Sequence, residues 1–116
     1  MLSVFDLLAA NTLNLDLAAY LMARISKGSS FMVGSVPGGA GKTTVMCALL
    51  NFLPIEVPIV AATDRAIYAA ANGKPKQRSC YVCHEIGSGY YFAYLWADAL
   101  RAYCGLFEKG HILATN

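Results

Sequence analysis

The fold is decided by residues 34–44, GSVPGGAGKTT, which follow the apolar run 31–33 and precede a helical pattern at 45–53. A glycine-rich loop between a strand and a helix turns its backbone N–H groups, with those of the helix N-terminus, toward phosphate oxygens. The order strand, loop and helix therefore predicts a site for nucleotide phosphates. The alternative is a glycine-rich turn in which the lysine occurs by chance.

The last part of this loop carries the side chains with a chemical role. Lys42 would neutralise charge on the β- and γ-phosphates, and Thr43 would offer its hydroxyl to Mg²⁺. The pattern G-x-x-x-x-G-K-[ST] starts at position 36, where this chain has Val36, whereas Gly34 comes too early. We expect ATP and Mg²⁺ as cofactors, held by the residues that lead into the helix: Pro37, Gly38, Gly39, Ala40, Gly41, Lys42, Thr43 and Thr44.

A second candidate group follows residues 79–83, whose near-continuous apolar character is typical of a strand buried on both faces of a parallel sheet. Glu85 lies just beyond the carboxyl end of that strand. There it could bind Mg²⁺ through water, or orient and deprotonate an attacking water. We therefore expect Lys42 and Glu85 to be catalytic, and Thr43 and Glu85 to serve the metal ion.

The sequence Cys80-Tyr81-Val82-Cys83-His84 also spells C-x-x-C-H, the pattern of c-type haem attachment and of a cysteine pair for zinc or redox chemistry. In a strand the two cysteines would lie about 10 Å apart on opposite faces, so they would neither pair nor share a metal ion. Haem attachment would also require export. We therefore interpret the pair as structural, and we expect Cys47 and Cys104 to be small buried side chains.

The remaining pattern predicts alternating helices and strands. We expect helices at 1–10, at 15–26 after the N-cap Asn14, at 44–53, as a short turn at 66–71, and over the whole of 90–109. We expect strands at 31–34, 57–63, 79–83 and 111–116, and the last ends in Thr115 and Asn116, which could sense a γ-phosphate. The fold predicted is a three-layer α/β core with a mainly parallel sheet of four strands. It divides into a helical lead-in, 1–28, and a nucleotide-binding core, 29–116.

Composition narrows the function classes. The chain has 116 residues, which allows one domain with a modest core. Apolar residues make up 57% and charged residues 14%, which suggests covered surfaces, either in an oligomer or in a larger protein of which this chain is a piece, because a free-standing domain usually carries more charge. The net charge of +2 is too small to favour nucleic acid as a partner. No uncharged apolar run is long enough for a membrane span, and the N-terminus lacks a signal pattern, so we expect a cytoplasmic protein.

These motifs resemble the RecA-like core of P-loop NTPases, in particular the ATPases of type II and type IV secretion and of pili. Residues 17–53, with Lys27-Gly28, an apolar strand and PGGAGKTT at 37–44, are similar to the start of that core. The segments 83–87 and 110–116 are similar to the family's stretch from the Walker B glutamate to the histidine-containing strand after it. The likeness spans most of the chain, and its one specific motif is the loop.

The resemblance implies ATP hydrolysis in a homo-oligomer, a hexameric ring, with peripheral association to a membrane machine. It also implies that Lys42 and Thr43 act on the phosphates and Mg²⁺, and that Glu85 is the catalytic glutamate.

The chain departs from this family in three ways. Besides Val36, it has the single Asp64 where an acidic pair is usual, and Arg78 alone in place of an arginine-rich stretch. The family's sheet has the strand order 5-1-4-3-2, and no fifth strand is predicted here. We therefore expect an incomplete core in which residues 1–27 or another subunit cover the exposed edge of the P-loop strand.

Two other functions fit the sequence. The loop also looks like that of adenylate-kinase-like enzymes, which would make the chain a small phosphotransferase. Those enzymes close an arginine-rich lid over the nucleotide, whereas Arg65, Arg78 and Arg101 are scattered here. Alternatively, the chain is a module that binds a nucleotide without turnover.

Overall fold

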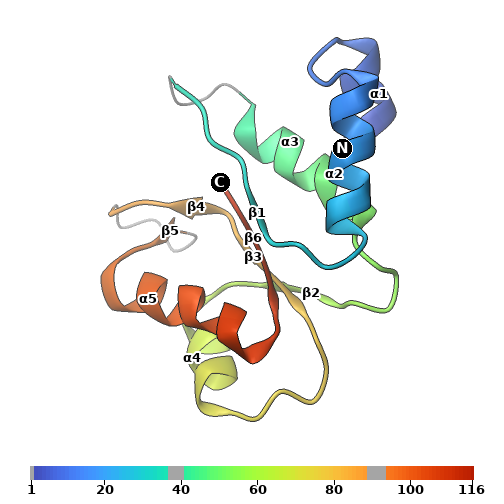
Figure 1. Ribbon diagram of the computed structural model, residues 1–116. Coiled ribbons are helices and arrows are strands. Elements are labelled where there is room, and N and C mark those ends of the chain that lie inside the picture. Colours follow the sequence, from blue (N-terminus) through green and yellow to red (C-terminus); the bar gives the residue numbers. More distant parts are fainter. Residues whose placement is uncertain (1, 37–40, 89–93) are drawn as a thin grey trace.

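The computed structural model describes residues 2–36, 41–88 and 94–116, and its centre is a parallel sheet. The sheet contains β1 (Phe31–Met32), β2 (Ile59–Ala61), β3 (Cys80–Cys83) and β6 (Ile112–Thr115). Their order is β1-β6-β3-β2, and all three neighbouring pairs run parallel (Figure 1). The predicted α/β fold with a mainly parallel sheet of four strands is therefore confirmed, and these strands follow the order 1-4-3-2.

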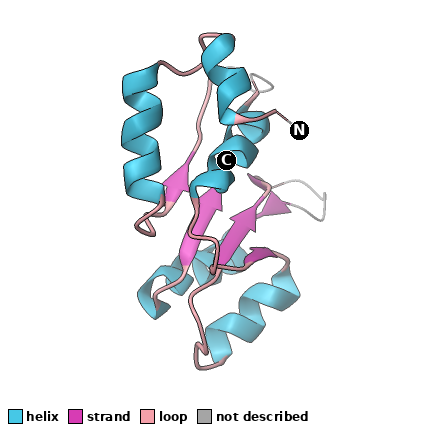
Figure 2. Ribbon diagram, turned by 90° about the vertical axis from the view of Figure 1, so that its right-hand side faces the viewer, coloured by secondary structure: helices cyan, strands magenta, loops and turns pink. Residues whose placement is uncertain are grey.

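Helices cover both faces of the sheet. One layer contains α1 (Val4–Ala9), α2 (Leu15–Ile25) and α3 (Lys42–Leu49), which continues as the 3-10 turn η1 (Leu50–Phe52). The other layer contains α4 (Asp64–Asn72) and α5 (Ala97–Gly105), which continues as the 3-10 turn η2 (Leu106–Lys109). Figures 1 and 2 show the two groups on opposite sides of the strands. The molecule thus has three layers, with the sheet in the middle.

Strand β3 alternates between the two cores, as the period of a strand requires. Cys80 packs with Ile112 and Ala114 beneath η1, whereas Cys83 packs with Leu95 and Tyr103 beneath α5. The two buried cysteines therefore face opposite helical layers, as predicted, and both are free thiols. The prediction for Cys104 is wrong, because this residue lies on the exposed side of α5.

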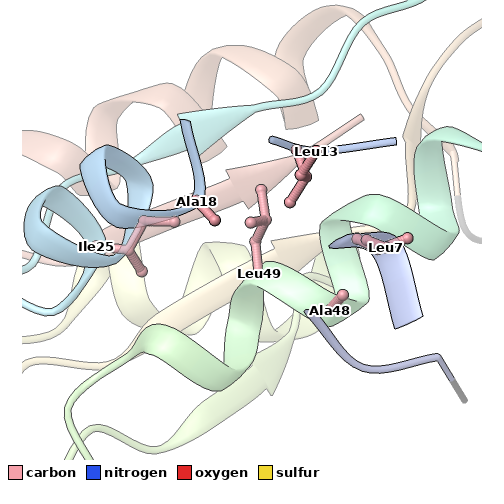
Figure 3. Packing of buried hydrophobic residues seen from close by; sticks show 6 residues of the cluster. All are labelled: Leu7, Leu13, Ala18, Ile25, Ala48 and Leu49. Atoms are coloured by element: carbon pink, nitrogen blue, oxygen red, sulfur yellow. The ribbon is translucent and has the colours of Figure 1, made fainter. Parts of the chain in front are cut away.

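The helical lead-in is held against α3 by an apolar cluster. Its buried members come from α1, from the turn after α1, from α2 and from α3. Figure 3 shows them: Leu7, Leu13, Ala18, Ile25, Ala48 and Leu49. Both N-terminal helices start at side-chain caps, because Ser3 and Asp6 form a capping box and Asn14 Oδ1 accepts from Leu17 N at 2.7 Å. The lead-in therefore packs on the same face of the sheet as α3.

The prediction of one long helix over 90–109 is wrong for residues 94–96. Helix α5 begins at Ala97, and β5 (Tyr94–Leu95) instead pairs in parallel with β4 (Glu85–Ile86). Residues 89–93 lie outside the described part of the chain. Aromatic side chains suit a strand at least as well as a helix, and Leu95 gains burial against Cys83 and Tyr103 when the segment is extended. Tertiary burial therefore outweighs the helical pattern here.

Two helices also begin earlier than predicted. Helix α3 begins at Lys42 rather than at position 44, so that Lys42 and Thr43 belong to its first turn. Helix α4 begins at Asp64, because the Thr63 hydroxyl accepts from Ala66 N at 3.1 Å and caps the helix earlier than expected. Among the helices that the structure describes, none has both the length and the apolar character needed to cross a membrane.

Candidate functional site

Gly41 links the loop to helix α3 and has a backbone that favours glycine. Its φ of 88° lies in the left-handed region, and it is the residue that precedes the helix. A Cβ atom built at Gly41 would meet no heavy atom within 4 Å, so conformation rather than space restricts this position. The predicted phosphate-binding residues Pro37, Gly38, Gly39 and Ala40 lie outside the described residues.

The side chains of Lys42 and Glu85 meet although they are remote in sequence. Lys42 Nζ lies 3.4 Å from Glu85 Oε1, and the side chains are 19% and 35% exposed. Lys42 stands at the first position of α3, and Glu85 stands at the first position of β4, directly after β3. The two residues predicted to be catalytic are therefore in contact.

Asn116 joins a third segment to the same place. Its side-chain amide Nδ2 donates to Thr43 Oγ1 at 3.0 Å and lies 3.7 Å from Met46 Sδ. The backbone fixes it as well, because Ile86 N donates to Asn116 O at 3.1 Å. With 8% of its surface exposed, Asn116 is buried at this edge of the sheet.

The architecture explains why these groups converge. Glu85 and Asn116 follow the carboxyl ends of the adjacent parallel strands β3 and β6, and the loop follows the carboxyl end of β1. In parallel α/β sheets the carboxyl ends of the strands form one edge, which is where ligands bind. In this structure that edge brings Lys42, Glu85, Asn116 and Thr43 together around the N-terminus of α3.

A cavity of about 320 Å³ opens beside the first turns of α3. It is lined by Thr43, Thr44 and Cys47, and by Leu2 from the start of the lead-in. No pattern in the sequence links Leu2 to the loop, because its placement depends on how α1 packs on α3. Val36 stands where the loop motif has its first glycine. Its side chain is fully exposed and packs on no other part of the described chain.

The donor atoms at this edge match the chemistry of Mg²⁺. The ion prefers oxygen ligands and keeps several waters when it is bound with phosphates, so it needs few protein groups. Thr43 Oγ1 and the Glu85 carboxylate are oxygens of this kind. The described residues hold no cluster of three or more His, Cys, Asp or Glu side chains that would suit a metal enclosed by protein ligands alone.

Among the described residues, Arg78, Arg101 and Asp64 form no ion pair with Lys42 or Glu85. The Arg78 guanidinium lies next to Gly28, just before β3 and thus at the amino end of the sheet. Arg101 pairs with Asp98 on the exposed face of α5 at 3.0 Å. Asp64 starts helix α4 and is exposed. Arg78 is therefore too far along the strand direction to reach the loop of its own chain.

The chain matches no protein-family profile, and neither curated proteins nor solved structures give a significant match.

Proposed function

We propose that the chain binds the phosphates of a nucleotide, ATP, together with Mg²⁺, at the carboxyl edge of the sheet. The observation that supports this most is the meeting of Lys42 with Glu85, and of Asn116 with Thr43, from three remote segments. If Lys42 followed a glycine-rich turn only by chance, its contact with the acidic residue that follows β3 would not be expected.

Each side chain then has a role set by its chemistry. The backbone N–H groups of the first turn of α3, with its positive dipole, hold phosphate oxygens. Lys42 neutralises the charge of the terminal phosphates, and Mg²⁺, when it is bound near Thr43 and Glu85, supplies further charge neutralisation. Asn116 holds the Thr43 hydroxyl in place through its amide.

The same arrangement supports hydrolysis. A carboxylate at the position of Glu85 can accept a proton from a water that attacks the γ-phosphate, as a general base. Lys42 now occupies one oxygen of that carboxylate. In the proposed reaction the phosphates attract Lys42 away, and Glu85 becomes free to take the proton.

We also propose that the chain belongs to the P-loop NTPases, as part of an oligomeric ATPase of the secretion and pilus type. The strand order β1-β6-β3-β2 supports this proposal, because it agrees with the order of that fold apart from a fifth strand. The edge position of β1 fits an assembly in which a neighbouring subunit covers the free side of the strand. A homo-oligomer, a hexameric ring in the cytoplasm at a membrane machine, is the form that the resemblance suggests.

Binding without turnover is the second candidate function, and two observations favour it. First, the ion pair neutralises the charges of Lys42 and Glu85, the two groups expected to be catalytic. Second, Arg78 lies at the opposite end of the sheet. An arginine that stabilises transition-state charge would then have to come from elsewhere.

The test measures ATP binding by calorimetry and phosphate release with Mg²⁺, with and without AMP as an acceptor. We expect Lys42→Ala to weaken binding by at least about tenfold, because a charge-assisted contact contributes roughly 1.5–3 kcal/mol. Phosphate release without AMP that is lost in Glu85→Gln supports the ATPase, whereas transfer that requires AMP supports a phosphotransferase.

Lys27→Ala is the matched control, because Lys27 is an exposed lysine that follows α2 and is remote from the loop. It should leave the binding of ATP unchanged. Binding that is lost in Lys42→Ala, with no turnover in the parent chain, supports the module without turnover. Equal ATP affinity in the parent chain and in Lys42→Ala would refute the proposed site.

A further inference from the structure

The amino end of the sheet, opposite the candidate nucleotide site, holds a second polar cavity. It has a volume of about 190 Å³ and lies between the end of α4, the basic loop 74–78 and the first residues of β3 and β6. Its lining includes Lys74, Lys76, Gln77, Ser79, Tyr81 and His111. The loop 74–78 therefore shares a cavity with a buried histidine.

His111 has a fixed tautomer at this cavity. Its Nδ1 accepts a hydrogen bond from Ser79 N at 3.2 Å, and a backbone N–H can only donate. Nδ1 therefore carries the lone pair, and in the neutral ring the proton is on Nε2. Burial and the nearby Lys109 lower the pKa of His111, so the ring is neutral at neutral pH. Its edge-on contact with the Tyr81 ring, 5.1 Å between centroids, also holds its orientation.

The Nε2–H group of His111 has no partner within the described part of the protein. His111 is only 6% exposed, yet among the described residues its ring is held by Ser79 N and by the Tyr81 ring. Among the described residues, every side-chain nitrogen or oxygen that is fully shielded from solvent has a hydrogen-bond partner. An Nε2 without a partner is therefore not shielded, and we infer that it opens to the cavity that His111 lines. An N–H donor without a protein partner on the wall of a cavity is a group that a ligand oxygen can satisfy.

The charge around the cavity is positive. Lys74 and Lys76 belong to its lining, and Lys109 Nζ donates to the carbonyl of Gly73, another lining residue, at 2.8 Å. The ion pairs found among the described residues are Lys42–Glu85 and Arg101–Asp98, so none of these three lysines is neutralised by a described carboxylate. A cavity with donors and uncompensated cations attracts an anion.

From these contacts we propose that this cavity is a binding site for a small oxyanion of phosphate size, separate from the nucleotide site. Its His111 Nε2–H would donate to one oxygen, while Lys74 and Lys76 supply charge. Ligand pockets for larger molecules usually have about 300–1,000 Å³, so a volume of about 190 Å³ favours an inorganic anion over a nucleotide. The two sites lie at opposite ends of β3 and β6, which run from Ser79 and His111 toward Glu85 and Asn116.

The test uses inorganic phosphate on the full chain carrying Lys42→Ala, which removes the lysine of the other site. The ring signals of His111 are followed by NMR, with those of His84 as an internal reference and sodium chloride at equal ionic strength as the salt control. We expect a saturable shift of the His111 signals with phosphate and none with chloride. A shift that does not saturate, or that chloride reproduces, would overturn the proposal.

Two variants identify the groups involved. Lys74→Ala with Lys76→Ala should weaken phosphate binding by about fivefold, since exposed charges contribute modestly, and both side chains are exposed and dispensable for folding. Arg24→Gln removes an exposed cation from α2 and should leave the affinity unchanged.

His111→Asn keeps an acceptor for Ser79 N and removes the Nε2–H donor, so it should abolish binding, followed through the backbone signals of Ser79 and Gln77. Unchanged affinity in the double lysine variant, or in a folded His111→Asn protein, would refute the site. A phosphate response that disappears with Lys42→Ala would place the anion on the phosphate loop alone, and would refute it too.

Discussion

The Lys42–Glu85 ion pair joins the Lys42 ammonium group to the Glu85 carboxylate, whereas the proposed reaction requires these two groups to separate. Its two side chains are partly exposed, so solvent screens the attraction and the pair contributes at most about 1 kcal/mol. Phosphate groups carry more charge than one carboxylate, so a nucleotide can displace Glu85 from Lys42. At the proposed nucleotide site, the pair would therefore compete weakly with the nucleotide for Lys42.

Glu85→Gln is expected to increase the affinity for ATP by about two- to fivefold when Mg²⁺ is absent, because Lys42 is released and a negative charge is removed. A binding titration without the metal isolates this effect from any contact between Glu85 and the ion. Asp98→Asn breaks the exposed pair with Arg101 and should change nothing. Weaker binding of ATP by the Glu85 variant would contradict the competition.

Two glycines are expected to respond in opposite directions to the same substitution. Gly41→Ala places a Cβ on a residue with φ of 88° and should cost about 1 kcal/mol of stability, whereas Gly105→Ala, at φ of −65° in helical backbone, should gain about 0.5–1 kcal/mol. Urea denaturation measures both changes. Equal effects of the two substitutions would show that the left-handed backbone at Gly41 is not maintained in solution.

At the scale of elements, Tyr103 of α5 connects a helix to two strands. Its side chain is buried, and its hydroxyl lies 2.8 Å from Tyr81 O of β3 and 3.0 Å from Ala114 O of β6. One hydroxyl proton is shared between two carbonyl acceptors. This contact fixes α5 across the central strands and so fixes the outer layer on the sheet.

Tyr103→Phe should lower the free energy of unfolding by about 1–2 kcal/mol, the usual cost of removing a buried hydrogen bond without changing the shape of the core. Tyr68→Phe removes a hydroxyl from an exposed tyrosine of α4 and serves as the control. Chemical denaturation of both variants tests the prediction, and a loss of similar size in both would contradict it.

The elements that the sequence predicted well are those with local signals. Asn14 caps α2, and Gly28 follows the helix with a φ of 98°, so both ends of that helix could be predicted from short-range chemistry. The first part of 90–109 could not, because its extended conformation depends on the pairing of β5 with β4 and on the burial of Leu95 against Cys83 and Tyr103. Periodicity there suited a helix and a buried strand almost equally.

The candidate site divides in the same way. Lys42, Thr43 and Glu85 could be named from the sequence because a loop motif and the end of an apolar strand mark them. The contact of Asn116 with Thr43 required the order of β6 and β1 in the sheet, and the approach of Leu2 to Thr43 required the packing of α1. Contacts between elements are set by tertiary packing, which no local pattern encodes.

For the molecule as a whole, buried ionisable groups make stability depend on alkaline pH. Burial raises the pKa of Cys80 to about 11, from 9.0, and also raises the pKa of Cys83 and Tyr103. The folded state therefore keeps these groups protonated at a pH where the unfolded chain releases their protons. The contribution of the protonated Cys80 thiol to the free energy of unfolding is fully present below pH 9. It is lost as the pH rises through 9 toward 11.

We expect the free energy of unfolding, measured with a reductant present, to fall steadily between pH 9 and 11. Cys80→Ala should reduce this slope, even if the substitution lowers stability at neutral pH, because a thiol that ionises in the unfolded chain is gone. Cys104→Ala removes an exposed thiol and should keep the slope. A slope that Cys80→Ala leaves unaltered would mean that other groups cause the alkaline loss.

The position of β6 between β1 and β3 also determines the order in which the protein can assemble. The contact between Ser79 and His111 at the start of β3 and β6 spans 32 positions, whereas Leu113 N and the Ser30 hydroxyl, next to β1, are 83 positions apart. Closing the longer loop costs somewhat more entropy, so we expect β6 to pair with β3 before β1 pairs with β6. The strand that carries the glycine-rich loop is therefore expected to dock late, so the candidate nucleotide site would form near the end of folding, on a sheet already built.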